Sequence, residues 1–183
     1  MLDKSGFDEV RNMNKAKRLI DNMEKEKASE FIFEIGEIDD NATPLKQAKY
    51  INNLLNLAYN KDVCMVDTMR KCGGCCISAN AIKIAKKLYA KAKDIPDFLQ
   101  FLNEADIGGR NLHLSGNKII AIYKKCYCNI PKKIKDMNKS YCECSAGWYM
   151  KLFSEVFEKN VSVKIINTIV NGADECTFEI SNF

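Results

Sequence analysis

Apolar side chains recur at helical spacing through residues 1–107. They form a loose stripe over residues 10–28 and a regular i, i+3, i+4 pattern over residues 44–58. A third helix is expected over about residues 75–92, and a short fourth begins at Pro96 and ends before Gly108 and Gly109. This part of the chain is therefore predicted to be mainly helical.

After residue 108, apolar side chains recur at every second position, as they do in strands. Strands are predicted at residues 112–114, 118–125, 161–169 and 176–180, with turn residues between them, and residues 145–158 are the clearest helix. Four strands with one long helix between the two hairpins predict an α+β fold, in which helices pack on a four-stranded antiparallel sheet. We expect one domain, residues 1–183, with a helical part (1–107) and a sheet-plus-helix part (108–183).

Composition and charge narrow the function classes. The 28 basic and 24 acidic side chains give a net charge of +4, spread along the chain without a basic stripe, so nucleic acid is not an expected partner. No apolar run reaches the roughly 18 residues of a membrane span, and residues 1–11 lack the apolar core of a signal peptide. We expect a cytoplasmic protein whose nine cysteines stay reduced. Dinucleotide, P-loop and GxSxG motifs are absent.

Two C-x-C pairs lie at the ends of regular elements. Cys126 and Cys128 follow the second strand, and Cys142 and Cys144 enter the long helix. If the connecting segment folds back, four thiolates at about 2.3 Å would complete a zinc site or hold an iron–sulfur cluster. We therefore predict a metal site at these four residues, with the alternative that they are small buried hydrophobes.

A second cysteine group, Cys72, Cys75 and Cys76, encloses Gly73 and Gly74. C-x-x-C at a helix start is typical of a redox dithiol, and the helix dipole would lower the pKa of Cys75. The glycines allow close backbone approach. Metal ligation, alone or jointly with the first group, dithiol chemistry and a structural role all remain open.

Two further side chains are weaker candidates. His113 is the one histidine of the chain and lies on a predicted strand, where a solvent-facing position is expected rather than a catalytic one. Trp148, one turn into the long helix, is expected in the core, with a ligand pocket as the alternative.

Residues 142–183 resemble a known family. The run CECSAGW, a helix, a strand, the turn at Gly172 and a last strand with Cys176 and Phe178 are similar to the C-terminal half of the 4-vinyl-reductase-type, hydrocarbon-binding domain. Its relatives include aminothiazoline-carboxylate-hydrolase-like proteins, and the cysteine pairs resemble an uncharacterised cysteine-rich bacterial branch. The resemblance implies an antiparallel α+β fold, a homodimer and a pocket for a small apolar ligand.

Three functions follow from these patterns. The first is a small-molecule-binding protein with a thiolate metal site, filled by zinc or an iron–sulfur cluster. The second is a metal-dependent hydrolase or an iron–sulfur redox enzyme. The third is a dimeric interaction or sensor domain whose thiols respond to oxidants.

Overall fold

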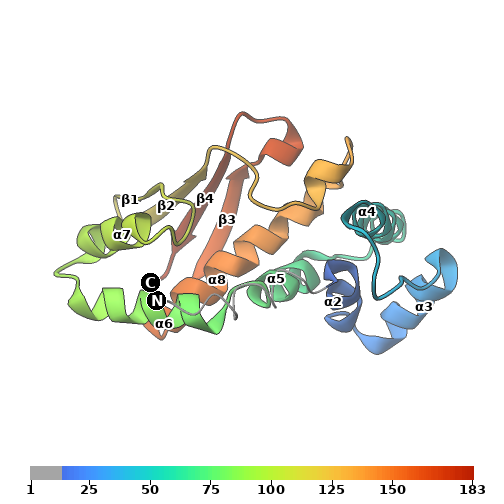
Figure 1. Ribbon diagram of the computed structural model, residues 1–183, viewed down its shortest axis with the longest axis horizontal. Coiled ribbons are helices and arrows are strands. Elements are labelled where there is room, and N and C mark those ends of the chain that lie inside the picture. Colours follow the sequence, from blue (N-terminus) through green and yellow to red (C-terminus); the bar gives the residue numbers. More distant parts are fainter. Residues whose placement is uncertain (1–13) are drawn as a thin grey trace.

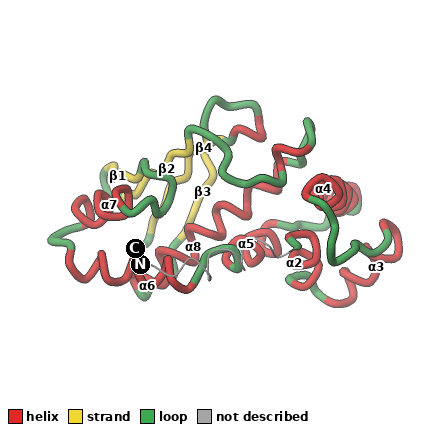
Figure 2. Tube along the Cα trace, viewed as in Figure 1, coloured by secondary structure: helices red, strands yellow, loops and turns green. Residues whose placement is uncertain are grey.

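The computed structural model describes residues 14–183. Its helices are α2 (Lys15–Asp21), α3 (Lys25–Ile35), α4 (Pro44–Asn60), α5 (Val66–Gly74), α6 (Ala79–Lys91), α7 (Ile95–Glu104) and α8 (Glu143–Phe157). The strands are β1 (Leu112–Ser115), β2 (Lys118–Tyr123), β3 (Ser162–Asn167) and β4 (Cys176–Ser181), and short 3₁₀ turns lie at Pro131–Lys133, Lys139–Cys142 and Ile169–Asn171. Helices α2, α3 and α4 lie at one end of the molecule, and the strands lie at the other end together with α6 and α7 (Figure 2).

The four strands form one antiparallel sheet in the order β1-β2-β4-β3. The two hairpins therefore meet through β2 and β4, and α8 connects them along the chain. This confirms the predicted α+β fold with a long helix between two hairpins. Ile119 of β2 and Val163 of β3 both pair with Ile180 of β4, so that three buried side chains line one row of the sheet.

The long helix α8 covers one face of this sheet. Its face of Tyr149, Leu152, Phe153 and Val156 is buried, as the i, i+3, i+4 spacing predicts. The Tyr149 hydroxyl donates a 2.9 Å hydrogen bond to the Gly108 carbonyl and so satisfies its polar group inside the core. Helices α6 and α7 complete this first apolar core.

A second apolar core lies at the helical end. It is built mainly from α2, α3, α4 and α5, with Phe31 and Leu54 fully buried, and the segment before α8 closes it through Ile130, Met137 and Tyr141. Figure 1 shows α2, α3 and α4 at one end, with α5 between them and the sheet. None of the helices in residues 14–183 is both long and apolar enough to cross a bilayer.

Helices α5 and α8 lie side by side and touch through glycines (Figure 1). A Cβ on Gly73 would overlap the carbonyl of Cys144, and a Cβ on Gly147 would overlap the carbonyl of Arg70. Each helix thus places a glycine against the backbone of the other helix. Any side chain at either glycine position would hold the two helices apart. The Arg70 side chain also pairs with Glu143 at 2.8 Å.

The third predicted helix needs a correction. Helix α5 already ends at Gly74, so the segment expected as one helix over residues 75–92 begins with a turn at residues 75–78. Helix α6 follows this turn, and its N-cap Ser78 accepts a 3.1 Å hydrogen bond from Ala81 N–H. The loose stripe over residues 10–28 divides into α2 and α3, and its positions Val10 and Met13 lie outside the described residues.

Gly147→Ala tests the contact between α5 and α8. Because the new methyl group would overlap the Arg70 carbonyl, we expect the free energy of unfolding to fall by about 1–3 kcal/mol or more. Gly74→Ala is the matched control: its Cβ would meet Lys151 at an ordinary 3.6 Å. Urea unfolding of both variants measures the difference, and equal stabilities would contradict a glycine-dependent contact.

Candidate functional site: a thiol centre between α2, α5 and α8

All nine cysteines are free thiols within the described residues, and they differ in exposure. Cys64 and Cys75 are exposed, three are half-buried (Cys76, Cys126 and Cys128), and four are buried (Cys72, Cys142, Cys144 and Cys176). Apart from Cys128, the buried and half-buried thiols form two sets at the start of α8. Because residues two apart project roughly 200° apart around a helix, Cys142 and Cys144 belong to different sets.

The first set joins the last turn of α5 to the first turn of α8. Cys144 shares hydrogen bonds with both Cys72 and Cys76. The Cys76 sulfur also lies 3.5 Å from the Cys72 carbonyl oxygen. These contacts follow from the glycine contact, because Gly73 sits directly on the backbone of Cys144. We call Cys72, Cys76 and Cys144 the thiol centre.

The hydrogen bonds give the three thiols different acidities. The hydrogen bond from Cys144 lowers the pKa of Cys72 below its ordinary value of 9.0, although burial opposes this. Donating that proton raises the pKa of Cys144 to about 12. The hydrogen bond to Cys144, together with burial, raises the pKa of Cys76 far above its ordinary value. Cys72 is therefore the thiol of this centre that ionises most readily.

Two cations of α2 face the thiol centre. Arg18 is 5% exposed, and its Nη1 donates a 3.3 Å hydrogen bond to the Cys75 carbonyl, while its Nε has no partner within residues 14–183. The positive charge of Arg18 contributes to the lowered pKa of Cys72 and offsets part of the rise in the pKa of Cys76. Lys15, one turn earlier, offsets part of the rise in the pKa of Cys144. Among the described residues, neither cation pairs with a carboxylate.

Lys15 also touches a fourth sulfur. Its ammonium group donates a 2.9 Å hydrogen bond to the Cys128 sulfur, and the Tyr141 hydroxyl lies 2.7 Å from that sulfur. Burial lowers the pKa of Lys15, but the charges of Cys144, Tyr141 and Cys128 outweigh it and raise this pKa well above its ordinary value. Burial raises the pKa of Tyr141.

The second set lies on the other side of the α8 N-terminus. Cys142 hydrogen-bonds the fully buried Thr168 and is within electrostatic range of Cys176 and Cys126. Burial raises the pKa of Cys142 to about 12, and it also raises the pKa of Cys126 and Cys176. The Ile169 N–H donates a 3.3 Å hydrogen bond to the Cys176 sulfur. These thiols stay protonated and behave as small buried side chains.

The predicted four-sulfur site is divided between these sets. Cys144 contacts Cys72 and Cys76, whereas Cys142 faces Cys126 and Cys176. Within residues 14–183, no three or more Cys, His, Asp or Glu side chains form a group placed to hold a metal ion. Zinc or an iron–sulfur cluster at Cys126, Cys128, Cys142 and Cys144 stays a prediction.

The role predicted for Cys75 is wrong in its geometry. Cys75 follows the C-terminal end of α5 and does not start a helix, and its side chain is exposed. Sequence reasoning missed three residues of the site: Lys15, Arg18 and Tyr141. A signal existed for Arg18, which lies between Ala16 and Leu19 on the apolar face of α2.

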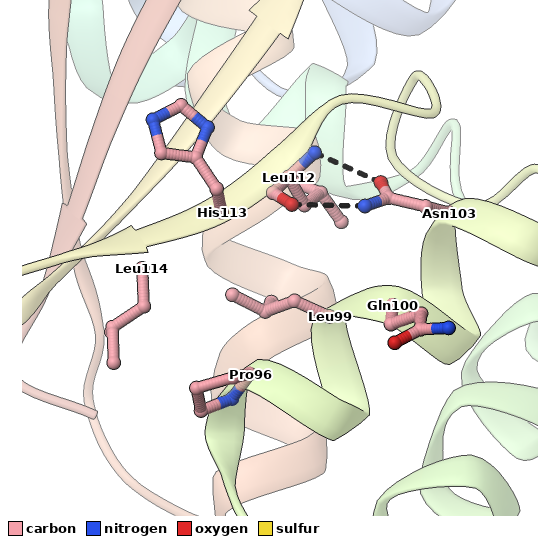
Figure 3. A pocket seen from close by; sticks show the side chains of 7 residues that line it. All are labelled: Pro96, Leu99, Gln100, Asn103, Leu112, His113 and Leu114. Carbon is pink, nitrogen blue, oxygen red and sulfur yellow. Dashed lines mark hydrogen bonds between the residues drawn. The ribbon is translucent and has the colours of Figure 1, made fainter.

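A shallow groove of about 330 Å³ lies elsewhere, between α7 and β1. Pro96 and Leu99 of α7 face the strand, and Asn103 makes two 2.9 Å hydrogen bonds to the backbone of Leu112 (Figure 3). His113 lines this groove and is exposed, as expected. Trp148 does not line it; the indole packs edge-on against Tyr149 in the first core.

Fold and site together define an α+β protein with a buried thiol centre flanked by two cations. The chain belongs to DUF6144, a family of unknown function, whose model matches residues 7–182. No curated protein matches the sequence. An H-NOX protein from S. oneidensis, solved in the Fe(II)NO ligation state, is 11% identical over 86% of this chain and 88% of that chain, with a TM-score of 0.38. A likeness at this level defines neither fold nor function.

Alkaline pH tests the acidity of Cys144. The folded chain keeps this proton up to about pH 12, whereas the unfolded chain loses it near pH 9.0, so stability falls as pH rises between these values. The free energy of unfolding should fall by at most about 1.4 kcal/mol per pH unit from this one group. Cys144→Ser, which does not titrate there, should lose less stability in urea unfolding across this range. Parallel curves for the two proteins would contradict the raised pKa.

Proposed function

We propose that the protein is a thiol-based redox sensor, in which Cys72 is oxidised and Cys144 closes a reversible disulfide with it. The observation that carries the proposal is the close approach of α5 and α8 at Gly73, which sets the buried Cys72 beside the buried Cys144. Next to them lie two cations, Lys15 and Arg18, that have no carboxylate partner among residues 14–183. A thiolate is the reactive form of cysteine, and nearby cations favour it. The sequence also predicted a sensor domain with oxidant-responsive thiols as one of three functions, and the proposal assigns that role to the thiol centre.

The reaction needs a hydroperoxide as oxidant. The Cys72 thiolate attacks the outer peroxide oxygen, the O–O bond breaks, and the alkoxide or hydroxide leaves and takes up a proton from water, giving Cys72 sulfenic acid. The Cys144 sulfur then attacks this sulfur and loses its own proton, and hydroxide leaves to form water with it. Two thiols lose two electrons in total, and the peroxide gains them. Because Cys72 is 3% exposed, we expect small hydroperoxides to react and bulky alkylating agents to be excluded.

Oxidation would also change the charge balance around α2. The disulfide removes the thiolate that faces Lys15 and Arg18, and a buried cation without a partner is costly. The docking of α2 against α5 is therefore weakened in the oxidised form. Because oxidation of the thiols would change the docking of α2, the protein would act as a sensor and would not merely contain a reactive thiol.

A thiolate-bound zinc ion or iron–sulfur cluster is the second candidate. It is favoured by the number of sulfurs near Lys15 (Cys72, Cys76, Cys128 and Cys144) and by the two cations, which match the net charge of about −2 of a zinc ion with four thiolates. The side chains would have to rotate to reach a common ion. The small apolar ligand, the homodimer and the 4-vinyl-reductase resemblance stay predictions beside either candidate.

Peroxide titration tests the disulfide. The anaerobically purified protein, treated with one equivalent of hydrogen peroxide, should lose about 2 Da, and peptide mapping without reductant should link Cys72 to Cys144. Cys72→Ser and Cys144→Ser should abolish this species, while Cys75→Ser, an exposed neighbour, should keep it. A link between other cysteines would contradict the proposal. Roughly one metal per chain, released by peroxide, would favour the second candidate.

Limited proteolysis tests the response of α2. In the reduced protein Arg18 is buried, so trypsin should cut after it slowly; in the oxidised protein we expect cleavage there to rise severalfold. Reductant should restore the slow rate. The matched control is oxidised Cys144→Ser, which cannot form the disulfide. Unchanged cleavage of the disulfide form would show that the thiols do not control α2.

A further inference from the structure

We propose that Lys15 and Cys128 form a covalent nitrogen–oxygen–sulfur bridge when the protein meets dioxygen. The Lys15 Nζ and Cys128 Sγ atoms are 2.9 Å apart, although 113 residues separate them in the chain. One oxygen atom inserted between the two atoms would need little movement of either. The proposal does not rest on the redox function of Cys72 and Cys144.

The two reacting groups are held in place from both sides. The Lys15 backbone N–H donates a 2.9 Å hydrogen bond to the side-chain oxygen of Gln47, which fixes the start of α2. The buried Tyr141 places its hydroxyl 2.7 Å from the Cys128 sulfur and 3.4 Å from Lys15 Nζ. Nitrogen, sulfur and phenol oxygen thus form a fixed triangle, and fixed geometry favours reaction between neighbours.

The surroundings of Cys128 favour nitrogen as its reaction partner. Its sulfur contacts Lys15 and Tyr141, whereas the neighbouring Cys126 directs its S–H to the Cys128 carbonyl oxygen at 3.6 Å. Cys128 is half-buried, so dioxygen can reach it while the protein limits access of large thiols. An oxidation that begins at this sulfur therefore finds an amine at contact distance.

The reaction is balanced with dioxygen as the oxidant. The lysine ammonium, the cysteine thiolate and one dioxygen give the N–O–S bridge and one water. Nitrogen keeps one of its three protons and the other two leave in the water. Sulfur and nitrogen each lose two electrons, and dioxygen gains four: one of its oxygens joins the bridge, and the other becomes water. Oxidation of the sulfur also removes a charge that helps to hold the proton on Lys15.

The bridge would tie α2 to the segment that precedes α8. A crosslink across so long a loop restricts the unfolded chain, so the bridged form should unfold at a higher temperature. It would hold the same helix that the Cys72–Cys144 disulfide is proposed to loosen. The two modifications would therefore act on α2 in opposite directions and have different masses.

Intact mass spectrometry of the full chain before and after exposure to air tests the bridge. We expect a species heavier by about 14 Da, one oxygen gained and two hydrogens lost, that reductant reverses. Peptide mapping should give a linked pair of peptides containing Lys15 and Cys128. The species should persist in Cys72→Ser, where the proposed disulfide cannot form.

Lys15→Arg is the matched variant, because it keeps the positive charge but has no primary amine. It should lack the 14 Da species, and Cys75→Ser should retain it. Air exposure that gives only sulfenic or sulfinic acid at Cys128, or a 14 Da species that maps to other residues in the native chain, would overturn the proposal. The mapping of the native chain decides the question even if Lys15→Arg fails to fold.

Discussion

The backbone contact between α5 and α8 is the constraint on which the rest of the structure depends. Gly73 rests on Cys144, and Gly147 rests on Arg70, so the two helices approach more closely than side chains would permit. On one side of this contact, α8 covers the sheet and completes the first apolar core; on the other, α5 joins the helices of the second. The same contact brings Cys72 and Cys144 together.

Much of the fold follows from residue patterns that report burial directly. The strands alternate, and α8 carries Tyr149, Leu152 and Phe153 at helical spacing, so both were predictable. Helix α5 was not, because its buried face is Met69, Cys72 and Gly73. A face made of sulfur and glycine lacks the aliphatic signal, although it is the face that makes the close contact.

The sequence predicted that cysteines form the site, but it did not predict which cysteines lie together. Cysteines were the evident candidates, but neighbours in sequence suggested that Cys142 and Cys144 act together, whereas helix geometry turns them to opposite sides. Which cysteine faces which depends on how α5 crosses α8. The cations Lys15 and Arg18 come from a helix more than fifty residues before Cys72, and no local pattern connects them to it.

The opposed ends of α5 and α8 act differently on the thiols of this centre. The N-terminus of α8 beside Cys144 favours negative charge, but Cys72 lies in the last turn of α5, where free carbonyls disfavour it. Arg18 donates to the Cys75 carbonyl and so satisfies part of that helix end, while its charge also acts on Cys72 and Cys76. Lys15 reaches further, to Cys128 and Tyr141. Helix α2 is thus linked to the thiols by hydrogen bonds and by its two positive charges as well as by packing, and this link is what the proposed oxidation of Cys72 would alter.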